Sequence, residues 1–522
     1  MQFERYNKCV NKLETLADLI LSFTGCLIFL GLSWYTMRYT QHIPQYYDEL
    51  PVNNRDSEWQ NLLALMAVML VFAVLLKLEK RISAKVQTCI RRIFLTALSL
   101  WVGVGGWLWI TSVDRVPVGD QAFIYGGASY FIEGGYFFLG KGAYCDMCPH
   151  QLGLIALVEL LFRFVGTYNY FACQMICVGM AVGIVIFGYL TIRQLSERTA
   201  VAVIYCLLMF GCLPLIFYTG WVYGDIPSVF FILMAAYYLL RYGRSGHWGW
   251  LVGIVFSVTL AILVRMNSII MLIALCLTAG VHALVKRDKK LLLGLLMAVL
   301  LPWLAYTGIY KMYQLRSGTD PLGGMPAASY IAMGMQEKDG KYGWFTQYCK
   351  QVYWDAGNDP KVAAEVSWQD VRERLDVFMG NPSYTWQFYR EKILSQWNQP
   401  LYQSLFFSAQ YPDSITPEPD SIDAKIHGLY SWNVLKICDR IQFVLYFGVF
   451  LYFLFALKKG SNILHHLLAA TIVGGFFFSI IWEAKARYIF PYYLMMYPLA
   501  VTGFLQVMNK LKTLWMSLLV KN

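Results

Sequence analysis

Charged residues are scarce in this chain: Asp, Glu, Lys and Arg make up 14% of its 522 residues, whereas 58% are hydrophobic and 16% are aromatic. Because soluble domains carry about 25% charged residues, this composition excludes an ordinary soluble protein. The sequence also lacks internal repeats and low-complexity tracts. Many secondary transporters are built from duplicated halves, so the absence of a repeat weakens a transporter interpretation.

Metal-ligand and disulfide patterns are nearly absent as well. The twelve cysteines lie mostly in apolar runs, where Cys acts as a small hydrophobic residue. Only Cys145 and Cys148, in CDMCPH, are close together in a polar region, and no second Cys/His pair with ligand spacing accompanies them. Cys145 and Cys148 could form half of a zinc site or a strained disulfide, and metal binding is disfavoured.

Long apolar runs are what the sequence has in abundance. A bilayer core of about 30 Å needs about 20 apolar residues in a helix, and isolated strands cannot satisfy their backbone in lipid. We therefore predict an all-α polytopic membrane protein with about twelve transmembrane helices. The predicted spans are 16–37, 60–79, 92–112, 170–192, 199–219, 225–241, 248–264, 268–286, 291–311, 439–457, 461–482 and 488–508.

The basic connectors orient these spans, because cytoplasmic loops carry an excess of Lys and Arg. Strict alternation places all of them on one side, provided that 150–166 does not cross; this segment is short, contains Glu159 and Arg163, and fits a helix lying in the membrane plane. We predict a multi-pass plasma-membrane protein with both termini cytoplasmic and the first run acting as a signal anchor. The basic connectors are 77–92, 193–198, 241–247, 286–290, 458–459 and the C-terminal KLKT stretch.

The net charge of +11 is explained by these cytoplasmic rims and by anionic membrane lipids, so we expect no nucleic-acid partner. The same orientation gives 113–169, the turns at 220–224, 265–267 and 483–487, and the large segment 312–438 a common outer face. Function is expected there.

Two acidic residues begin apolar stretches on this outer face. Asp120 follows a Pro-Val-Gly turn, and Asp225 lies in YTGWVYGDIPS at the start of a span, beside Tyr223. A carboxylate in such a position can act as a general base toward an attacking hydroxyl. Each also fits a helix-capping role that complements the helix dipole, and residue patterns alone do not separate the two interpretations.

Cations are rare in outer loops, yet IIWEAKARYIFPYY contains Lys485 and Arg487, and LVRMNS contains Arg265. A phosphate or pyrophosphate at the level of the lipid headgroups would suit them, because Arg binds phosphate through a bidentate fork. An internal ion pair between Glu483 and Arg487 is the alternative.

Taken in order, these motifs resemble the integral-membrane GT-C glycosyltransferases. The elements are a hydrophobic span, the Asp-Gln loop with its aromatic residues, a PHQLGL helix, the YGD-I-P turn, a large outer segment and a late E-x-x-x-R-Y before Pro. The similarity spans roughly residues 90–510 and includes the protein mannosyltransferase and aminoarabinose transferase relatives, and especially a Gram-positive bacterial branch.

The resemblance implies transfer of a sugar from a polyprenyl-phosphate donor to a glycan, lipid or protein acceptor on the outer face, in cell-envelope glycan or glycoconjugate modification. It implies that Asp120 is the base, that Asp225 arranges the acceptor or a metal, and that Arg487, Lys485 and Arg265 hold the donor phosphate. The resemblance implies no definite cofactor, and a divalent metal, Mg²⁺ or Mn²⁺, is an option. The supporting positions are Glu483, His150, Gln151, Tyr223 and Tyr488.

The implied domain organisation has four parts. They are two leading helices in 1–91, a GT-C-like catalytic membrane core in 92–311 that contains the outer loop 113–169, a mostly helical outer cap in 312–438, and a C-terminal membrane unit in 439–522.

Gln121 departs from the protein mannosyltransferases, which carry two adjacent acids in the first loop, and this argues against protein O-mannosylation. A nucleotide-sugar donor is disfavoured because the cytoplasmic side has no Rossmann or P-loop glycine pattern. The alternatives are a lipid-linked glycan polymerase, ligase or flippase, and then a secondary transporter.

Overall fold

The computed structural model describes residues 2–44, 49, 51–319, 323–409, 416–455 and 463–521. The predicted basic connector at 458–459 lies outside these residues. The α-helices are α1 (Gln2–Thr36), α2 (Glu58–Leu78), α3 (Ala84–Thr111), α4 (Asp120–Ile132), α5 (Tyr144–Met147), α6 (Leu152–Val165), α7 (Tyr170–Leu195), α8 (Thr199–Phe210), α9 (Leu213–Phe217), α10 (Asp225–Ser245), α11 (Trp248–Val264), α12 (Ile269–Lys286), α13 (Lys289–Ser317), α14 (Ala327–Met333), α15 (Tyr348–Asp355), α16 (Pro360–Gly380), α17 (Pro382–Trp397), α18 (Ser404–Ser408), α19 (Ile422–His427), α20 (Ser431–Phe455), α21 (Leu467–Ile481) and α22 (Phe490–Lys521).

Membrane-length helices dominate the molecule. Among the described residues, 10 helices are long and apolar enough to cross a membrane, or up to 12 if each of two bent helix pairs counts as one span. The predicted class, an all-α polytopic membrane protein, is therefore confirmed.

Two predicted spans take a less regular form. The span 199–219 consists of Thr199–Phe210 and Leu213–Gly220, which are bent by 59° at Gly211 and Cys212, and the span 248–264 is the shorter apolar helix Trp248–Val264. The segment predicted to lie in the membrane plane belongs to the other bent pair, Phe137–Met147 and Pro149–Val165, whose two arms meet at 104°. Pro149 lies at this break because its ring cannot continue the preceding helix.

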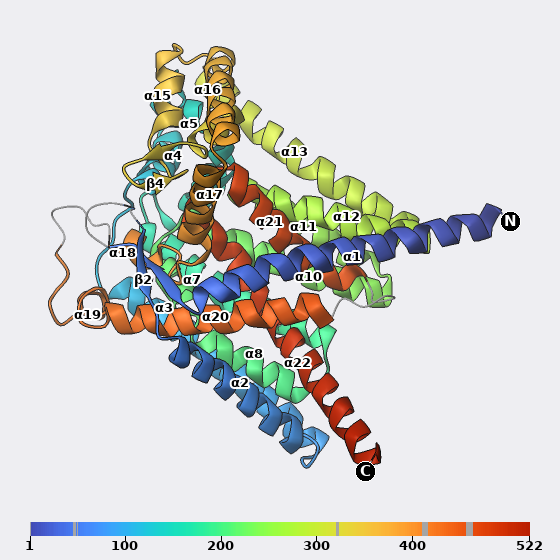
Figure 1. Cartoon of the computed structure of the whole chain (residues 1–522). Helices are drawn as coiled ribbons and strands as arrows, with labels where there is room; N and C mark the ends of the chain where they lie inside the picture. The colour runs from blue at the N-terminus through green and yellow to red at the C-terminus, as the bar shows by residue number, and fades with distance from the viewer. Residues whose placement is uncertain are drawn as a thin grey trace.

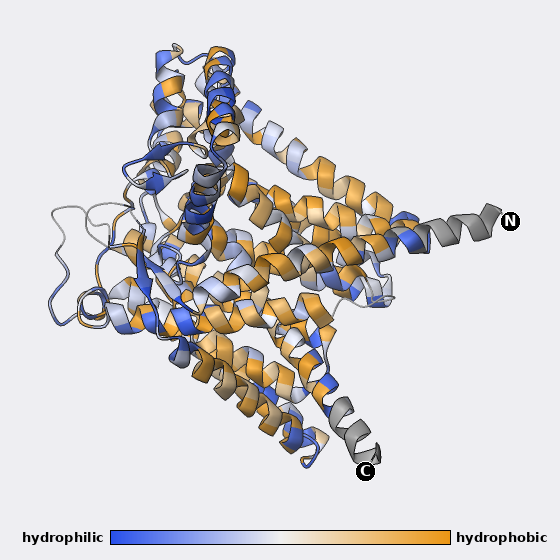
Figure 2. Cartoon of the chain, in the orientation of Figure 1, coloured by the Kyte–Doolittle hydropathy of each residue, from blue (hydrophilic) through white to orange (hydrophobic). Residues whose placement is uncertain are grey.

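The ends of the bundle differ in character. Both marked termini lie at the end of the bundle opposite α4, α15, α16 and α18 (Figure 1). Hydrophobic residues colour the helices between the two ends, whereas hydrophilic residues gather at α15 to α17 and around the strands (Figure 2). This distribution is the one that a bilayer imposes on a polytopic chain.

The segment 312–438 is mostly helical, as expected. Its helices begin with strong N-terminal signals: Asp359 caps the backbone N–H of Lys361 before Pro360 in α16, and Asn381 caps Tyr384 before Pro382 in α17. The strands are short antiparallel pairs, β1 (Tyr39–His42) with β2 (Val52–Arg55) and β3 (Glu337–Lys338) with β4 (Lys341–Tyr342).

The outer segment is joined to the turn between α21 and α22. The Ala484 N–H donates to the Gly343 carbonyl at 2.7 Å, and the buried Lys392 ammonium donates to the carbonyls of Gly334 and Ile480. Gly343 has φ 71°, and a Cβ there would lie 2.5 Å from the Gly334 carbonyl oxygen, so only glycine permits this approach. The packing fixes the turn that carries Glu483, Lys485 and Arg487.

Candidate active site

A cavity of about 460 Å³ collects nearly all of the side chains that the sequence singles out. It lies where the first loop, the turns before α10 and α12, and the turn before α22 meet the outer segment. Its lining includes Asp120, His150, Gln151, Tyr223, Arg265, Glu483, Lys485, Arg487 and Tyr488. Residues from most of the length of the chain therefore converge on one space.

Asp120 is the first residue of α4 and does not cap it, because Gly119, with φ 57°, occupies the capping position without a side chain. Within the described part of the chain, the Asp120 carboxylate has no hydrogen-bond or ion-pair partner. The carboxylate lies at the positive end of the α4 dipole, which stabilises its charge. Asp120 is thus a partly exposed carboxylate, available to a ligand.

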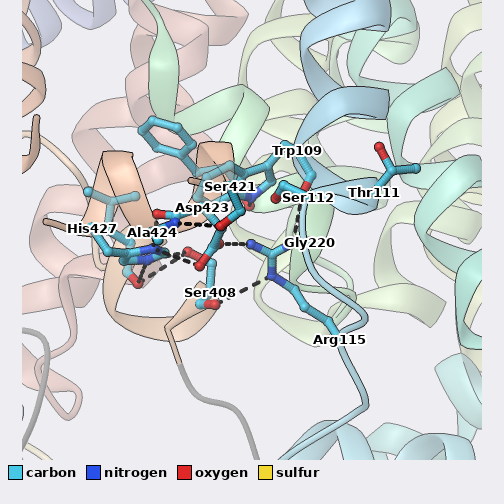
Figure 3. Close-up of polar contacts among 12 residues, drawn as sticks. Trp109, Thr111, Ser112, Arg115, Gly220, Ser408, Ser421, Asp423, Ala424 and His427 are labelled. Carbon is cyan, nitrogen blue, oxygen red and sulfur yellow. Dashed lines mark hydrogen bonds and ion pairs between the residues drawn. The ribbon is translucent and has the colours of Figure 1, made fainter. Parts of the chain in front are cut away.

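The loop that leads to Asp120 is held by a buried ionic cluster (Figure 3). The Arg115 guanidinium donates to the Asp423 carboxylate of α19 and, at 2.7 Å, to the Trp109 carbonyl at the end of α3. His427 lies 3.2 Å from the same carboxylate, and its other ring nitrogen faces Ser408 at 3.4 Å. This cluster ties the first loop to two helices of the outer segment.

Gln121, the residue that departs from the protein mannosyltransferase pattern, has a structural position. It is buried, and its Oε1 accepts hydrogen bonds from the Tyr170 hydroxyl at 2.6 Å and from the Val222 N–H at 2.8 Å. Gln121 therefore fixes α4 to the turn that carries Tyr223, and it points away from the cavity lining.

A chain of hydrogen bonds crosses the cavity wall from the PHQ element. Gln151 donates to the Tyr223 hydroxyl at 2.9 Å, and that hydroxyl lies 3.1 Å from the hydroxyl of Tyr144. Burial lowers the pKa of His150 to about 4, an effect that the nearby Asp120 charge opposes. At neutral pH, His150 therefore faces Asp120 as an uncharged ring.

Arg487 is the most unusual cation of the cavity. It is 4% exposed, and no carboxylate of the described residues lies within ion-pair distance of it. Its guanidinium lies over the rings of Phe407 at 4.8 Å and Tyr223 at 4.9 Å, and its Nε has no hydrogen-bond partner. A buried guanidinium that stacks on aromatic faces and forms no ion pair is well suited to receive an anion.

The other charges of this turn form neither the predicted Glu483–Arg487 ion pair nor a pair of free cations at Lys485 and Arg487. The Glu483 carboxylate accepts a hydrogen bond from Tyr488 and does not pair with Arg487. Burial raises the pKa of Glu483, against the lowering effect of Lys485. The Lys485 ammonium lies 3.0 Å from the carboxylate of Glu49, which belongs to the connection between α1 and α2 and also lines the cavity.

Asp225 lies behind the cavity wall. It is the first residue of α10, is fully buried and forms an ion pair with Arg265, which does line the cavity. Gly224 has φ 84°, and a Cβ there would lie 2.3 Å from the Val264 carbonyl oxygen. This close approach brings Asp225 and Arg265 together across two separate turns, so that Asp225 orients Arg265.

Neither a metal centre nor a disulfide is formed by the described residues. They contain no group of three or more His, Cys, Asp or Glu side chains that could hold a metal ion. Cys145 and Cys148 are both free; Cys145 is buried, and Cys148 lines the cavity. The option of a divalent metal beside Asp225 stays a prediction.

Sequence reasoning missed several lining residues. Tyr144, Tyr330, Trp482 and Lys350 line the cavity together with Glu49. Tyr330 and Trp482 stack at 4.9 Å with their planes 9° apart, which forms a flat aromatic wall. Trp344, Trp397 and Tyr402, also of the segment 312–438, are buried in packing and do not line the cavity.

A second cavity, of about 490 Å³, lies on the other face of α4 and is lined by Asp114, Arg115 and Tyr125 among others. None of the predicted site residues lines it. The Tyr125 hydroxyl and the Arg115 guanidinium already donate to protein oxygens.

Comparison with known proteins agrees with this geometry. Residues 149–306, less than a third of the chain, match the family model described as dolichyl-phosphate-mannose-protein mannosyltransferase. The match indicates a membrane glycosyltransferase of the GT-C type. No curated protein and no solved structure matched the chain.

The matched segment contains His150, Gln151, Tyr223, Asp225 and Arg265. It ends before the turn that carries Arg487 and begins after Asp120 and Gln121. It therefore does not test the distinction that Gln121 makes, and it does not separate branches within the GT-C type.

Proposed function

We propose that this protein transfers a sugar from a polyprenyl-phosphate donor to an acceptor hydroxyl at the outer face of the membrane. The observation that carries the proposal is the presence, in one cavity, of the Asp120 carboxylate and the buried Arg487 guanidinium, neither of which has an ion-pair partner among the described residues. A base for the nucleophile and a cation for the leaving group are the two charges that such a transfer needs.

The donor is a phosphodiester whose sugar is attached through its anomeric carbon. Its phosphate binds at Arg487, and Arg265, held in place by Asp225, lies in the same cavity wall. The polyprenyl chain remains in the lipid beside the bundle. Because the guanidinium is already desolvated and oriented, it stabilises charge on the phosphate with little reorganisation.

Asp120 takes the proton of the acceptor hydroxyl as its oxygen attacks the anomeric carbon. The bond between that carbon and the phosphate oxygen breaks, and its electron pair remains on the phosphate. Attack from the side opposite the phosphate inverts the configuration of the sugar. The stacked Tyr330 and Trp482 rings offer an apolar face for a sugar between the two charges.

The matched family supports this donor class by its description, which names a dolichyl-phosphate sugar. The acceptor class is a glycan, lipid or protein of the cell envelope. Gln121 supports an acceptor other than the hydroxyl of a protein side chain.

The decisive experiment combines a panel of polyprenyl-phosphate sugars with the variant Asp120→Asn. In membranes that contain the protein, one donor of the panel should be consumed, and D120N should lower kcat by about 10²–10⁴-fold while donor binding persists. Arg487→Lys should chiefly raise the KM for the donor, because Lys keeps the charge but loses the bidentate fork.

Asp114→Asn is the matched control, since Asp114 is an exposed carboxylate of the same loop that lines only the other cavity. It should leave turnover near the wild-type value. Full activity of D120N would refute the assignment of the base, and transbilayer movement of the lipid-linked sugar by the purified protein would favour a flippase.

A further inference from the structure

The Glu49 carboxylate lines the cavity in which we place the phosphate site. It comes from the connection between α1 and α2, far in sequence from the turn 482–488, yet it lines the cavity together with Arg487. Its two carboxylate oxygens lie 3.0 and 3.2 Å from the Lys485 ammonium. The side chains are 18% and 11% exposed, so water screens the pair only partly.

This pairing changes the charge that the turn presents to a ligand. Lys485 and Arg487 together would supply two positive charges, but Glu49 neutralises one of them. Arg265 is likewise neutralised by Asp225. Among the described residues, Arg487 is therefore the cation of this turn that forms no ion pair with a carboxylate, although the charges of Asp225 and Asp120 act on it at longer range.

Substrate and product of the proposed transfer differ in charge. A polyprenyl-phosphate sugar is a phosphodiester and carries one negative charge. After the sugar leaves, the polyprenyl phosphate is a monoester, which carries between about 1.5 and 2 negative charges at pH 7 because its second pKa is near 6. The unpaired guanidinium of Arg487 offers one ion pair to the diester, and the monoester brings an extra negative charge into a cavity that the Glu49 carboxylate also lines.

We propose that Glu49 is an internal counter-ion that restricts the phosphate site to singly charged phosphodiesters and promotes release of the doubly charged polyprenyl phosphate. This inference rests on the proposed function, because it takes the Arg487 site to be the phosphate site. The same repulsion acts against pyrophosphate-linked glycans, which carry more than one negative charge.

The experiment compares farnesyl phosphate with its methyl ester, methyl farnesyl phosphate, in which one methyl group replaces the second ionisable proton of the phosphate. Their dissociation constants are measured by calorimetry on the full-length protein in lipid nanodiscs at about pH 8. Wild-type protein should bind the methyl ester at least as tightly as the monoester. Glu49→Gln should tighten monoester binding on the order of tenfold and diester binding only slightly, because the neutral amide frees the Lys485 charge.

Glu58→Gln is the matched control. Glu58 pairs with Arg38 at 3.1 Å in the same N-terminal part of the chain and does not line the cavity. E58Q should leave both dissociation constants unchanged. In a turnover assay, E49Q should show stronger inhibition by added polyprenyl phosphate than the wild type.

The outcomes separate the two proposals. If Arg487→Ala abolishes binding of both probes while E49Q leaves their ratio unchanged, the role of Glu49 is refuted and the phosphate site stands. If E49Q weakens both probes equally, Glu49 merely orients Lys485, and the charge restriction is wrong. If R487A binds both probes as the wild type does, the phosphate site itself is refuted.

Discussion

Whether a cation of the cavity can bind an anion depends on the side chains that it contacts. Arg487 lies between aromatic faces. Lys485 pairs with the Glu49 carboxylate and lies 4.6 Å from the centre of the Phe345 ring, and Arg265 pairs with Asp225. The sequence presents the three as equivalent outer cations. Only the partners distinguish the guanidinium that can receive an anion from the two cations that are already paired.

His150 provides a test at the scale of one residue. Its pKa falls from the ordinary value of 6.5 to about 4 in the folded protein because burial disfavours the charged ring. Between these two values the unfolded chain binds the proton that the folded protein refuses, so acidification favours unfolding and stability falls as pH falls. The effect should disappear in His150→Gln.

The measurement is the thermal unfolding midpoint of the detergent-solubilised protein at pH 7.5 and at pH 5. The midpoint should fall more on acidification in the wild type than in H150Q, because other titrating groups contribute equally to both proteins. Equal decreases would show that His150 titrates normally in the folded state.

At the scale of secondary-structure elements, the active-site loop depends on helices distant in sequence. The Arg115 cluster joins the end of α3 to α18 and α19 (Figure 3). Gln121 joins α4 to the turn before α10. The turn 482–484 is held by Gly343 and Lys392. Burial lowers the pKa of Lys392 to about 7, against the effect of Glu483. The outer segment therefore holds in place both the loop that carries Asp120 and the turn that carries Arg487.

Removing one partner of the Arg115–Asp423 pair should be costly. Both side chains are nearly inaccessible, at 4% and 1% exposure, so Arg115→Met removes the guanidinium that pairs with a buried carboxylate. We expect a loss of about 3 kcal/mol of stability and a lower kcat, because the loop before Asp120 loses its anchor.

Chemical unfolding of the purified protein measures this loss, and the double variant R115M/D423L is its control. Replacing both charges by apolar groups should recover much of the stability, because no unpaired charge remains. An R115M protein as stable as the wild type would show that the pair has no net role.

At the scale of the whole molecule, the topology places the cavity and both termini at opposite ends of the helical bundle (Figure 1). The distribution of Lys and Arg predicts that the cavity end faces outward. The orientation determines whether substrates arrive from the envelope or from the cytoplasm.

Two thiols test the orientation. Lys338→Cys places an exposed thiol in β3 at the cavity end, and native Cys89 is an exposed thiol near the start of α3, at the other end. A membrane-impermeant maleimide should label K338C in intact cells and Cys89 only after permeabilisation, as followed by mass spectrometry of the labelled peptides. The reverse pattern would invert the topology.

The sequence by itself determined the class of the protein, the approximate position of most of the spans and the set of turns that contribute to one cavity. Hydropathy, charge bias and Pro or Gly breaks are local features of the sequence. In a bilayer, apolar runs must form helices, and the bias in Lys and Arg predicts which side of the membrane each loop faces. Local signals also led to Asp120, Tyr223, Arg265 and Arg487, and the family resemblance added His150; all five line one cavity.

Only the tertiary structure decided how these residues are partnered. It placed Asp225 behind the wall with Arg265, gave Gln121 a structural position, separated Glu483 from Arg487, and brought Glu49 to Lys485. Glu49 and Lys485, for example, are separated by 436 positions in the sequence, so no local pattern relates them. Partners are set by how helices pack, and packing depends on side-chain shape across the whole bundle, which no local pattern encodes.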